Sequence, residues 1–295
     1  MKEKVCFVLV GPTAVGKTDH ACRLADQLNT LIISADSRQC YKELDTGVSK
    51  PNEQQLRQIP HFFINSHSIH DNVNANVFEG YALQKVEEIF VQHDVAVMVG
   101  GTGLYIKAFC EGLDIIPFVD PEVRQRLSVA YNELGIVWLK EEIQKTDALF
   151  YAKGEMGNPQ RMLRALEVKI SSGKSVLEYH TAIKSPRSFS IRKIGLTLPR
   201  KELNTRIDMR VDMMMRNGLP EEAAVLYPYR SLNALQTVGY REMYEHLDGK
   251  ISLDEAVNRI KINTHRYAKR QMTWFKKDPD IQWIDAVSEL KSYRQ

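Results

Sequence analysis

The sequence predicts an α/β fold with a parallel sheet flanked by helices, and two observations lead to this prediction. Continuous apolar segments rich in β-branched residues stand at 5–10, 31–35 and 95–99. Such runs are typical of strands that are buried on both faces of a sheet. Helical patterns separate these segments, and strands that alternate with helices form βαβ units with right-handed crossovers. The strands are therefore expected to be parallel.

The elements of the first 111 residues can be justified in order. A Gly-rich turn after the first strand leads into a helix at about 18–28, and the second strand follows at 31–35. An amphipathic helix is predicted at 78–93, because apolar side chains recur on one face at Phe78, Ala82, Val86 and Ile89. The third strand follows that helix, and a further helix is expected just beyond the strand's end.

The pattern changes after Gly112. From there to residue 190 the periodicity is mainly helical and no buried strand is evident. We therefore predict a helical insertion domain at 112–190, between two parts of a core domain at 1–111 and 191–295. Within the insertion, Asn158-Pro159 is a typical helix start and Gly173 a typical helix stop.

The second part of the core is predicted to open with a strand at 191–198 that returns to the sheet. A helix at 200–217 follows and ends at Gly218. The pattern Ser252-x-x-Glu255 is a capping box that opens a long final helix. This helix should run to about residue 277, because Asp278-Pro279 does not continue a helix.

Composition excludes several classes of protein. The 295 residues include 43% apolar and 26% charged residues, which is near the average for globular proteins and unlike disordered, collagenous or coiled-coil chains. No apolar run approaches the ~18 residues that cross a bilayer. The first apolar run, residues 5–10, is too short for a signal peptide and lacks a cleavage site. A cytoplasmic protein without a membrane partner is expected.

Cysteine and histidine spacing argues against a metal or disulfide framework. The four cysteines have no C-x-x-C spacing, and the eight histidines are dispersed. His67 and His70 are three residues apart in an expected loop, but no third ligand lies nearby. We interpret them as a chance surface pair.

Charge is concentrated in the final helix. The net charge is only +3, yet residues 256–277 contain seven Lys or Arg and no Asp or Glu. A basic patch on a nearly neutral protein is a typical footprint for a phosphate backbone. The cations are interleaved with Tyr267, Trp274 and Phe275, a pattern that suits RNA. We expect the aromatic side chains to lie mostly in the core and the cations to face RNA.

A phosphate-binding loop follows the first strand. Residues 11–18 read Gly-Pro-Thr-Ala-Val-Gly-Lys-Thr and fit the pattern G-x-x-x-x-G-K-[ST]. The backbone N–H groups of such a loop and the start of the next helix converge on one anion, Lys17 adds a positive charge, and the Thr18 hydroxyl can hold Mg²⁺. The motif is typical of ATP-binding proteins, and it specifies a P-loop NTPase-like core.

The ends of the other strands do not match an ordinary NTPase. The third strand ends in Val99-Gly100-Gly101-Thr102, without the carboxylate that holds Mg²⁺ in such enzymes. Thr102 fits either a functional hydroxyl or the cap of a tight turn. Asp36 ends the second strand, where sites form in open α/β sheets. It fits a metal ligand, a general base, or a residue that caps a turn.

Two arginines of the predicted helix at 200–217 share one face. Arg206 and Arg210 are four residues apart and could clamp a second phosphate. From periodicity alone, however, an exposed face with ion pairs to neighbouring acidic residues is favoured.

These motifs together resemble one family, the tRNA dimethylallyltransferases, also called tRNA isopentenyltransferases. The matching segments follow the family's order over nearly the whole chain: the loop at 11–18, Asp36-Ser37-x-Gln39-x-Tyr41, Gly47-x-x-Lys50-Pro51, Gly100-Gly101-Thr102-Gly103-Leu104-Tyr105, Asp120-Pro121-x-x-Arg124, Asn158-Pro159-Gln160-Arg161, Arg164-Ala165-Leu166-Glu167, Gly239-Tyr240-Arg241, and Ala268-Lys269-Arg270-Gln271-x-Thr273-Trp274. The combination is far more specific than the phosphate-binding loop alone.

The resemblance implies a reaction and its catalytic residues. Dimethylallyl diphosphate would donate a five-carbon group to N6 of the adenosine 3′-adjacent to the anticodon, and diphosphate would leave. Asp36 matches the family's general base and Thr102 a residue near the reacting centre. Mg²⁺ on Thr18 would assist the leaving group. The diphosphate would be bound by Gly11, Pro12, Thr13, Ala14, Val15, Gly16, Lys17, Thr18 and Arg210.

The resemblance also implies contacts with tRNA, whose target adenine must leave the anticodon-loop stack to reach the site. In this family the insertion closes on the anticodon stem-loop, and further stretches of the core contact the same RNA. The expected tRNA-binding residues are Ser37, Arg38, Gln39, Arg124, Gln160, Arg161, Met162, Leu163, Arg164, Gln236, Thr237, Val238, Gly239, Tyr240, Arg241, Lys269, Arg270, Gln271, Trp274 and Lys276.

Departures from the family pattern are small. Val15 stands where relatives often have Ser, but the backbone N–H is retained, so no loss is expected. Arg38 replaces an often smaller residue. The C-terminal zinc finger of eukaryotic members is lacking, which resembles bacterial enzymes. A monomer is the default expectation.

Three alternative functions remain open from the sequence. A P-loop small-molecule kinase would turn over ATP and would have no use for the basic final helix. An adenylate isopentenyltransferase would prenylate free AMP, ADP or ATP and should lack the basic stretch at 269–277. A GTPase-like RNA-binding switch would show nucleotide-dependent RNA affinity and no prenyl transfer.

Overall fold

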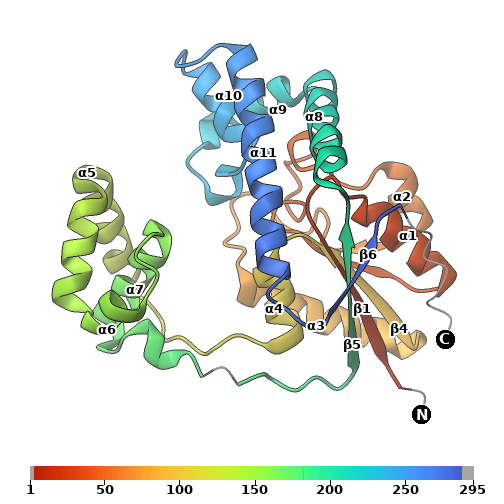
Figure 1. Ribbon diagram of the computed structural model, residues 1–295, viewed down its shortest axis with the longest axis horizontal. Coiled ribbons are helices and arrows are strands. Elements are labelled where there is room, and N and C mark those ends of the chain that lie inside the picture. The colour runs from red at the N-terminus through yellow and green to blue at the C-terminus, as the bar shows by residue number, and fades with distance from the viewer. Residues whose placement is uncertain (1–2, 182, 288–295) are drawn as a thin grey trace. The chain divides into compact units, whose positions relative to one another are not determined.

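Six parallel strands form one sheet in the order β3-β2-β4-β1-β5-β6 in the computed structural model, which describes residues 3–181 and 183–287 (Figure 1). The strands are β1 (Val5–Val10), β2 (Ile32–Ala35), β3 (His61–Phe62), β4 (Val95–Gly100), β5 (Ser190–Thr197) and β6 (Ile281–Asp285). The predicted parallel α/β fold is confirmed. The four predicted strands lie within one residue of their expected bounds, whereas β3 and β6 were not predicted.

The described chain divides into two compact units. One contains the sheet and comprises residues 1–111 and 186–295, and the other comprises residues 112–185. The second unit begins where the sequence predicted an insertion and ends a few residues earlier than expected. Among the described residues, no helix is long and apolar enough to cross a membrane.

Helices of the sheet unit follow the strands in the predicted alternation. They are α1 (Lys17–Gln27), α2 (Glu53–Gln58), α3 (Ala75–Gln92), α4 (Gly103–Glu111), α8 (Arg200–Arg216), α9 (Leu219–Leu226), α10 (Tyr240–Leu247) and α11 (Leu253–Phe275). Helix α11 packs against both α8 and α10 (Figure 1). It begins at the predicted Ser252, whose hydroxyl accepts the N–H of Glu255 (3.2 Å), and it ends two residues before the expected 277.

The second unit is helical and has its own core. Its helices are α5 (Pro121–Thr146), which is broken at Gly135, α6 (Ala148–Lys153) and α7 (Pro159–Ser172). Helix α7 starts and stops where predicted: the Asn158 side chain accepts two N–H groups, and Gly173 adopts the left-handed conformation that ends the helix. Its apolar face packs on α5, where Leu166 of α7 and Leu139 and Ile143 of α5 are fully buried, and Phe150 of α6 belongs to the same core.

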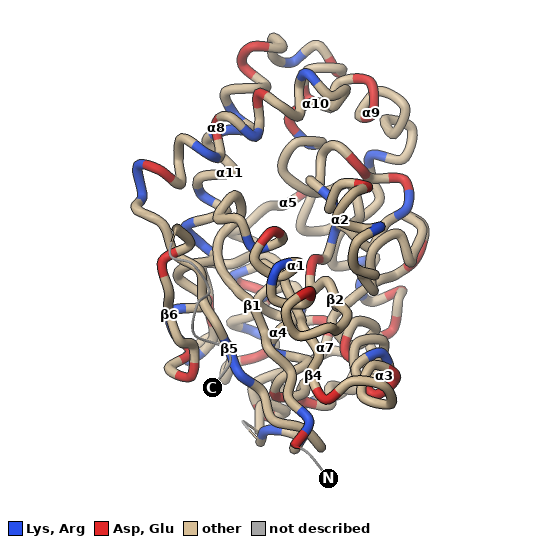
Figure 2. The backbone as a smooth tube through the Cα atoms, turned by 90° about the vertical axis from the view of Figure 1, so that its right-hand side faces the viewer, with Lys and Arg blue, Asp and Glu red and all other residues tan. Residues whose placement is uncertain are grey.

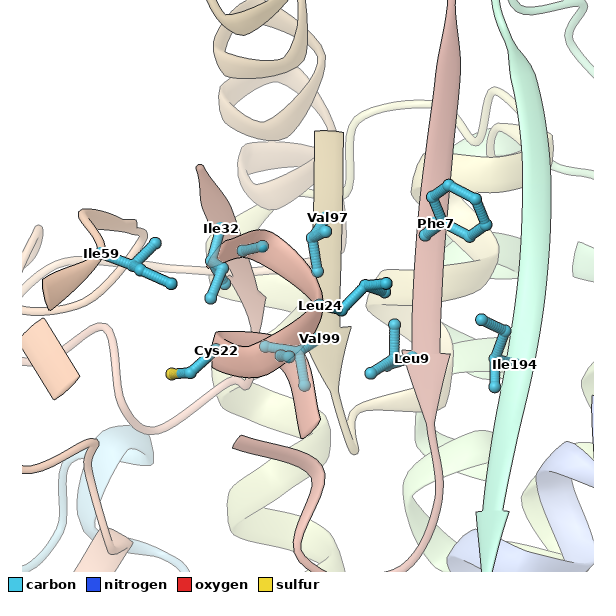
Figure 3. Packing of buried hydrophobic residues seen from close by; sticks show 11 residues of the cluster. Phe7, Leu9, Cys22, Leu24, Ile32, Ile59, Val97, Val99 and Ile194 are labelled. Atoms are coloured by element: carbon cyan, nitrogen blue, oxygen red, sulfur yellow. The ribbon is translucent and has the colours of Figure 1, made fainter. Parts of the chain in front are cut away.

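One hydrophobic core lies between α1 and the sheet. Figure 3 shows Leu24 of α1 between β4 and β1, in a cluster that includes Leu9 of β1 and Val97 and Val99 of β4. All four side chains are buried. This contact fixes α1, and therefore the loop before it, against the ends of the strands.

Removing that contact should destabilise the sheet unit. Leu24→Ala leaves a cavity in a fully buried position and is expected to lower the free energy of unfolding by about 2–5 kcal/mol. Val91→Ala, at a side chain that is 83% exposed, should change it by less than about 0.5 kcal/mol. Urea denaturation of the two variants checks this, and equal losses would show that Leu24 does not carry the packing assigned to it.

Candidate functional site

The register of the sheet brings three loops together. Val10 of β1 and Ala35 of β2 both pair with Gly100 of β4, so the three strands end side by side. The next residues along the chain are Gly11, Asp36 and Gly101. The phosphate-binding loop, the carboxylate and the glycine pair therefore start from one edge of the sheet, as expected for an open α/β sheet.

The loop at 11–18 is shaped to receive an anion. Gly16 has a φ of 98° as the N-cap of α1, a conformation that an L side chain rarely adopts, and it directs the chain into the helix. The Lys17 ammonium donates to the carbonyl of Pro12 (2.8 Å). Burial and the nearby Arg210 lower the pKa of Lys17 to about 7. Among the described residues Lys17 forms no ion pair, and Asp36 offsets the lowering of its pKa only in part, which favours binding of an anion.

Arg210 of α8 faces the same loop. Its Nη1 donates to the Thr13 hydroxyl (3.2 Å), and burial lowers the pKa of the guanidinium from its usual value. Arg206, one turn earlier, instead pairs with Glu202 (2.8 Å). Figure 2 shows several basic segments along α8, but only Arg210 among its arginines lines the cavity described next. Arg206 also lies near the loop, since its Nη1 would be 3.9 Å from a Cβ on Gly16, but of these two arginines only Arg210 bonds to the loop and lines the cavity.

A cavity of about 970 Å³ lies beside the three loops. Its lining includes charged and polar side chains from the phosphate-binding loop, α1, the loop after β2 and α8: Thr13, Lys17, Thr18, Asp36 and Arg210. Apolar side chains also line it, among them Val48, Pro51, Leu56, Val99, Met213 and Met214. The cavity therefore offers both ionic and apolar contacts to a ligand.

Asp36 lines the cavity and also caps a turn. Its Oδ1 accepts the N–H groups of Arg38 (2.9 Å) and Gln39 (3.3 Å). Among the described residues, no hydrogen bond engages Oδ2. The sequence offered turn capping and chemistry as alternatives, and the geometry accommodates both, because one oxygen fixes the side chain while the other can accept a proton.

Thr102 is tied to the residue after Asp36. Its hydroxyl accepts the N–H of Ser37 (3.0 Å) and donates to the Ser37 hydroxyl (3.3 Å). Among the described residues that line the cavity, neither Thr102 nor Ser37 is present. Thr102 thus connects the loop after β4 to the loop after β2.

The comparisons with known proteins agree with this geometry. The family model described as "IPP transferase" matches residues 39–278. The chain belongs to the IPP transferase family. A tRNA dimethylallyltransferase of Christiangramia forsetii is 47% identical over 96% of this chain and 94% of its own, and one of Cytophaga hutchinsonii is 43% identical over 98% and 96%.

Solved structures of the family share the fold. The full-length tRNA isopentenylpyrophosphate transferase of Bacillus halodurans is 36% identical, with a TM-score of 0.70 over 97% of this chain and 90% of that one. A eukaryotic dimethylallyltransferase acting on tRNA is 26% identical, with a TM-score of 0.78 over 96% and 74%. The family assignment therefore rests on sequence and on structure.

Several residues expected at the RNA surface are buried instead. Met162 and Leu163 lie in the core of the second unit, because they occupy the inner face of α7. Tyr240 is fully buried, and its hydroxyl donates to Glu222, whose carboxylate also accepts the N–H of Thr46 (2.7 Å). These three side chains serve packing and loop support, so RNA contact at these positions would have to involve the backbone, and it stays a prediction.

Two glutamines also differ from expectation. The Gln39 amide lines the cavity but is held within the protein, donating to the carbonyls of Val48 (3.3 Å) and Ser49 (3.0 Å). Gln271 is 5% exposed, lines the cavity and is bonded to two loops, so its side chain is absent from the outer surface of α11, and its contact with RNA stays a prediction. Helical spacing shows which residues of α11 share a face, but it could not show which face packs against the loops after β1 and β4.

Other candidates remain on the surface. Those of the sheet unit include Gln236, Arg241, Lys269, Arg270, Trp274 and Lys276, and those of the second unit include Arg124, Gln160, Arg161 and Arg164. Arg124 (3.2 Å) and Arg164 (3.3 Å) both pair with Glu167, which holds them beside each other. Arg38 donates to the carbonyl of Asn233 (2.7 Å). The exposure of these residues is compatible with RNA contact, which stays a prediction.

The aromatic residues of α11 are only partly in the core. Phe275 is buried as expected, whereas Tyr267 lines the cavity and Trp274 is 37% exposed. The Trp274 ring lies against Gly103, where an added Cβ would come within 2.3 Å of it. The expectation of a core stripe was therefore wrong for Tyr267 and Trp274, because this face of α11 borders the strand-end loops.

Sequence reasoning missed part of the apolar wall. Met213 and Met214 follow Arg210 by three and four residues on α8, so they share its face of the helix. This spacing was visible in the sequence. Val48 and Pro51 lie in a loop whose path depends on Glu222, which is distant in the sequence, and no local signal could have placed them.

Proposed function

We propose that this chain transfers the dimethylallyl group from dimethylallyl diphosphate to N6 of the adenosine 3′-adjacent to the anticodon of tRNA, with release of diphosphate. The observation that carries this proposal is the shared cavity: the phosphate-binding loop, Arg210 and the Asp36 carboxylate all line it. The relatives that are named tRNA dimethylallyltransferases support the choice of substrates.

The phosphate-binding loop would serve the leaving group. Cleavage of the carbon–oxygen bond places negative charge on the departing diphosphate. The loop N–H groups, Lys17 and Arg210 would bind that charge more strongly as it develops, which lowers the barrier. No phosphoryl group is transferred, so the glycines at 100–101 can stand where an NTPase has a carboxylate.

Asp36 would accept the proton from N6. The exocyclic amino group of adenine is a poor nucleophile, because its lone pair is delocalised into the ring. A carboxylate oxygen that accepts an N6 hydrogen as the new carbon–nitrogen bond forms makes the nitrogen more nucleophilic. Through its bonds to Ser37, Thr102 would hold the loop after β4 against the loop that carries Asp36.

Mg²⁺ fits this site as a companion of the diphosphate. Mg²⁺ takes oxygen ligands, keeps several waters and is commonly held by few protein groups plus phosphates. The Thr18 hydroxyl and the Asp36 carboxylate line the cavity, while the described residues contain no cluster of three or more carboxylate, His or Cys ligands. Thr18 would hold the ion, which would neutralise charge on the leaving group.

The exposed cations of α11 and of the second unit would bind the anticodon stem-loop, and the enzyme would act as a monomer. Lys269 and Arg270 are exposed on α11, two and three residues after the cavity-lining Tyr267. Phosphates bound there would place the anticodon loop close to the cavity. A free mononucleotide would leave these cations without a partner, which favours tRNA over AMP or ATP as the acceptor.

Replacing these cations should weaken RNA binding and its dependence on salt. Lys269→Ala with Arg270→Ala removes two phosphate contacts, so the slope of log Kd against log salt should fall by roughly 1.4, at ~0.7 per contact to single-stranded RNA. The control is Lys85→Ala with Arg192→Ala, which removes two cations away from the strand ends. Filter binding at several salt concentrations measures both, and an unchanged slope would contradict the role of α11.

Binding of diphosphate should depend on the charge of Lys17. An anion raises the pKa of Lys17 above its free value of about 7. The favourable contribution of this charge is therefore complete below pH 7 and declines as pH rises toward the bound-state pKa. Calorimetry with inorganic pyrophosphate at pH 8, in buffers of different ionisation enthalpy, should show proton uptake by the wild type that Lys17→Met lacks. Identical proton uptake in the two proteins would exclude this titration.

The acceptor atom can be tested directly. Anticodon stem-loops that differ only at the adenosine 3′ of the anticodon, with adenine or with unsubstituted purine, would be offered with dimethylallyl diphosphate and Mg²⁺. Mass spectrometry should find a five-carbon addition on the adenine substrate alone. Addition to the loop that lacks the N6 amino group would contradict transfer to N6.

A further inference from the structure

Gln271 connects the two sides of the cavity. Its Oε1 accepts the N–H of Thr13 in the phosphate-binding loop (2.8 Å), and its Nε2 donates to the carbonyl of Gly101 after β4 (2.9 Å). The side chain is 5% exposed. A buried amide that spans two loops separated by more than eighty residues is a strong constraint on their spacing, because breaking either bond would leave a buried polar group without a partner.

The surroundings of Gln271 are adapted to this contact. A Cβ on Gly101 would lie 2.2 Å from Nε2, so only glycine allows the amide to approach the carbonyl. Tyr267, one turn earlier on α11, also lines the cavity. The amide is thus held by the two loops on either side of it.

The two loops are proposed to serve different reactants, one the leaving diphosphate and the other the attacking nucleophile. The phosphate-binding loop would hold the leaving diphosphate. The loop after β4 carries Thr102, which bonds to Ser37 beside the proposed base Asp36. The distance between these loops therefore sets the distance between leaving group and nucleophile.

We propose that Gln271 is a positioning residue that sets the spacing of donor and acceptor, and that it links this spacing to the helix whose outer face binds RNA. This inference rests on the proposed function. Lys269 and Arg270 precede Gln271 by two residues and one residue on the same helix. RNA bound by these two side chains would therefore hold the helix that carries the Gln271 amide. Gln271 lines the cavity and is 5% exposed, so its side chain faces the reacting groups and not the outer face of α11.

The first test replaces the amide by a side chain of similar size. Gln271→Met should lower kcat by about 10–100-fold, since a shift of about 1 Å between reacting groups can reduce rate by ~10². The Kd for tRNA should stay within about threefold of the wild-type value. Thr273→Ala, an exposed position on the same helix, is the matched control and should retain wild-type kcat.

The second test restores one bond by protonation. In Gln271→Glu an ionised carboxylate can accept the Thr13 N–H but cannot donate to Gly101, whereas the protonated acid can do both. The charged and titratable groups around this position are Lys17, Arg210, Asp36 and Tyr267, all of which line the cavity, and Arg270 on α11. The same groups are present in the wild type, so the ratio of variant to wild-type kcat isolates the new carboxyl. It should rise as pH falls from 8 to 6.

The inference and the proposed function can fail separately. If the wild type transfers no dimethylallyl group, the proposed function and the catalytic role of Gln271 both fail. If the wild type is active and Gln271→Met keeps wild-type kcat, or loses tRNA affinity without loss of kcat at saturating tRNA, the positioning role is overturned. Hydrogen exchange measures the link between α11 and the phosphate-binding loop without turnover. The peptide that contains Thr13 should lose protection from exchange in Gln271→Met but not in Thr273→Ala. Unchanged protection would overturn the link.

Discussion

Asp36→Asn should lower kcat for prenyl transfer by ~10²–10⁴, the usual contribution of a general base. The amide retains an oxygen that can accept the N–H groups of Arg38 and Gln39, so the turn is preserved while the base is lost. The Kd for tRNA should not change, because the carboxylate lies in the cavity and not on the RNA-binding face proposed for α11. Single-turnover kinetics with radiolabelled dimethylallyl diphosphate measure the rate of transfer.

A matched control distinguishes chemistry from turn structure. Asp71 is also an aspartate that accepts a backbone N–H, from Ser68 (2.7 Å), but it does not line the cavity among the described residues. Asp71→Asn should leave kcat unchanged. Near-normal transfer by Asp36→Asn would remove this carboxylate from the proton-transfer step and leave turn capping as its function.

Arg210→Ala should reduce kcat by ~10²–10³, the loss seen when one group that stabilises developing negative charge is removed. Binding of tRNA should be retained, since Arg210 is directed at Thr13 of the phosphate-binding loop. The affinity for inorganic pyrophosphate, measured by calorimetry, should fall together with kcat. A parallel loss of kcat and of pyrophosphate affinity would identify the leaving diphosphate as the ligand of Arg210.

Arg206→Ala is the control for this prediction. The two arginines lie one turn apart on α8, yet Arg206 pairs with Glu202 (2.8 Å) and is absent from the described wall of the cavity. Its loss should change kcat by less than about threefold. Loss of tRNA binding in Arg210→Ala, with normal pyrophosphate affinity, would place Arg210 on the RNA side instead.

The strands that build the site could be predicted because each is a short apolar run between turn residues. The runs at β1, β2 and β4 placed Gly11, Asp36 and Gly101 at strand ends, and the parallel fold then put those ends on one edge. Strand β6 was missed because it follows Pro279 and its five residues, Ile-Gln-Trp-Ile-Asp, mix apolar and polar side chains, so no continuous apolar run marks it. Strand β3 has only two residues.

Long-range contacts determine the surroundings of residues that local sequence patterns could not place. Gln271 stands in a run of cations, which suggested an RNA-facing side chain, but its partners lie at Thr13 and Gly101. Arg210 shows the converse: periodicity favoured an exposed ion pair, and only the packing of α8 beside the loop directs its guanidinium at Thr13. Spacing within a helix tells which residues share a face, but the packing partners determine what that face contacts.

The most direct measurement of the proposed function is a prenyl-transfer assay with competing acceptors. Purified protein, Mg²⁺ and radiolabelled dimethylallyl diphosphate would be offered an unmodified anticodon stem-loop and, separately, AMP and ATP. Label on the stem-loop alone is the predicted result, because only RNA uses both the cavity and the cations of α11. Label on the mononucleotides would contradict tRNA as the substrate, and hydrolysis of ATP without any prenyl transfer would indicate kinase-like chemistry instead.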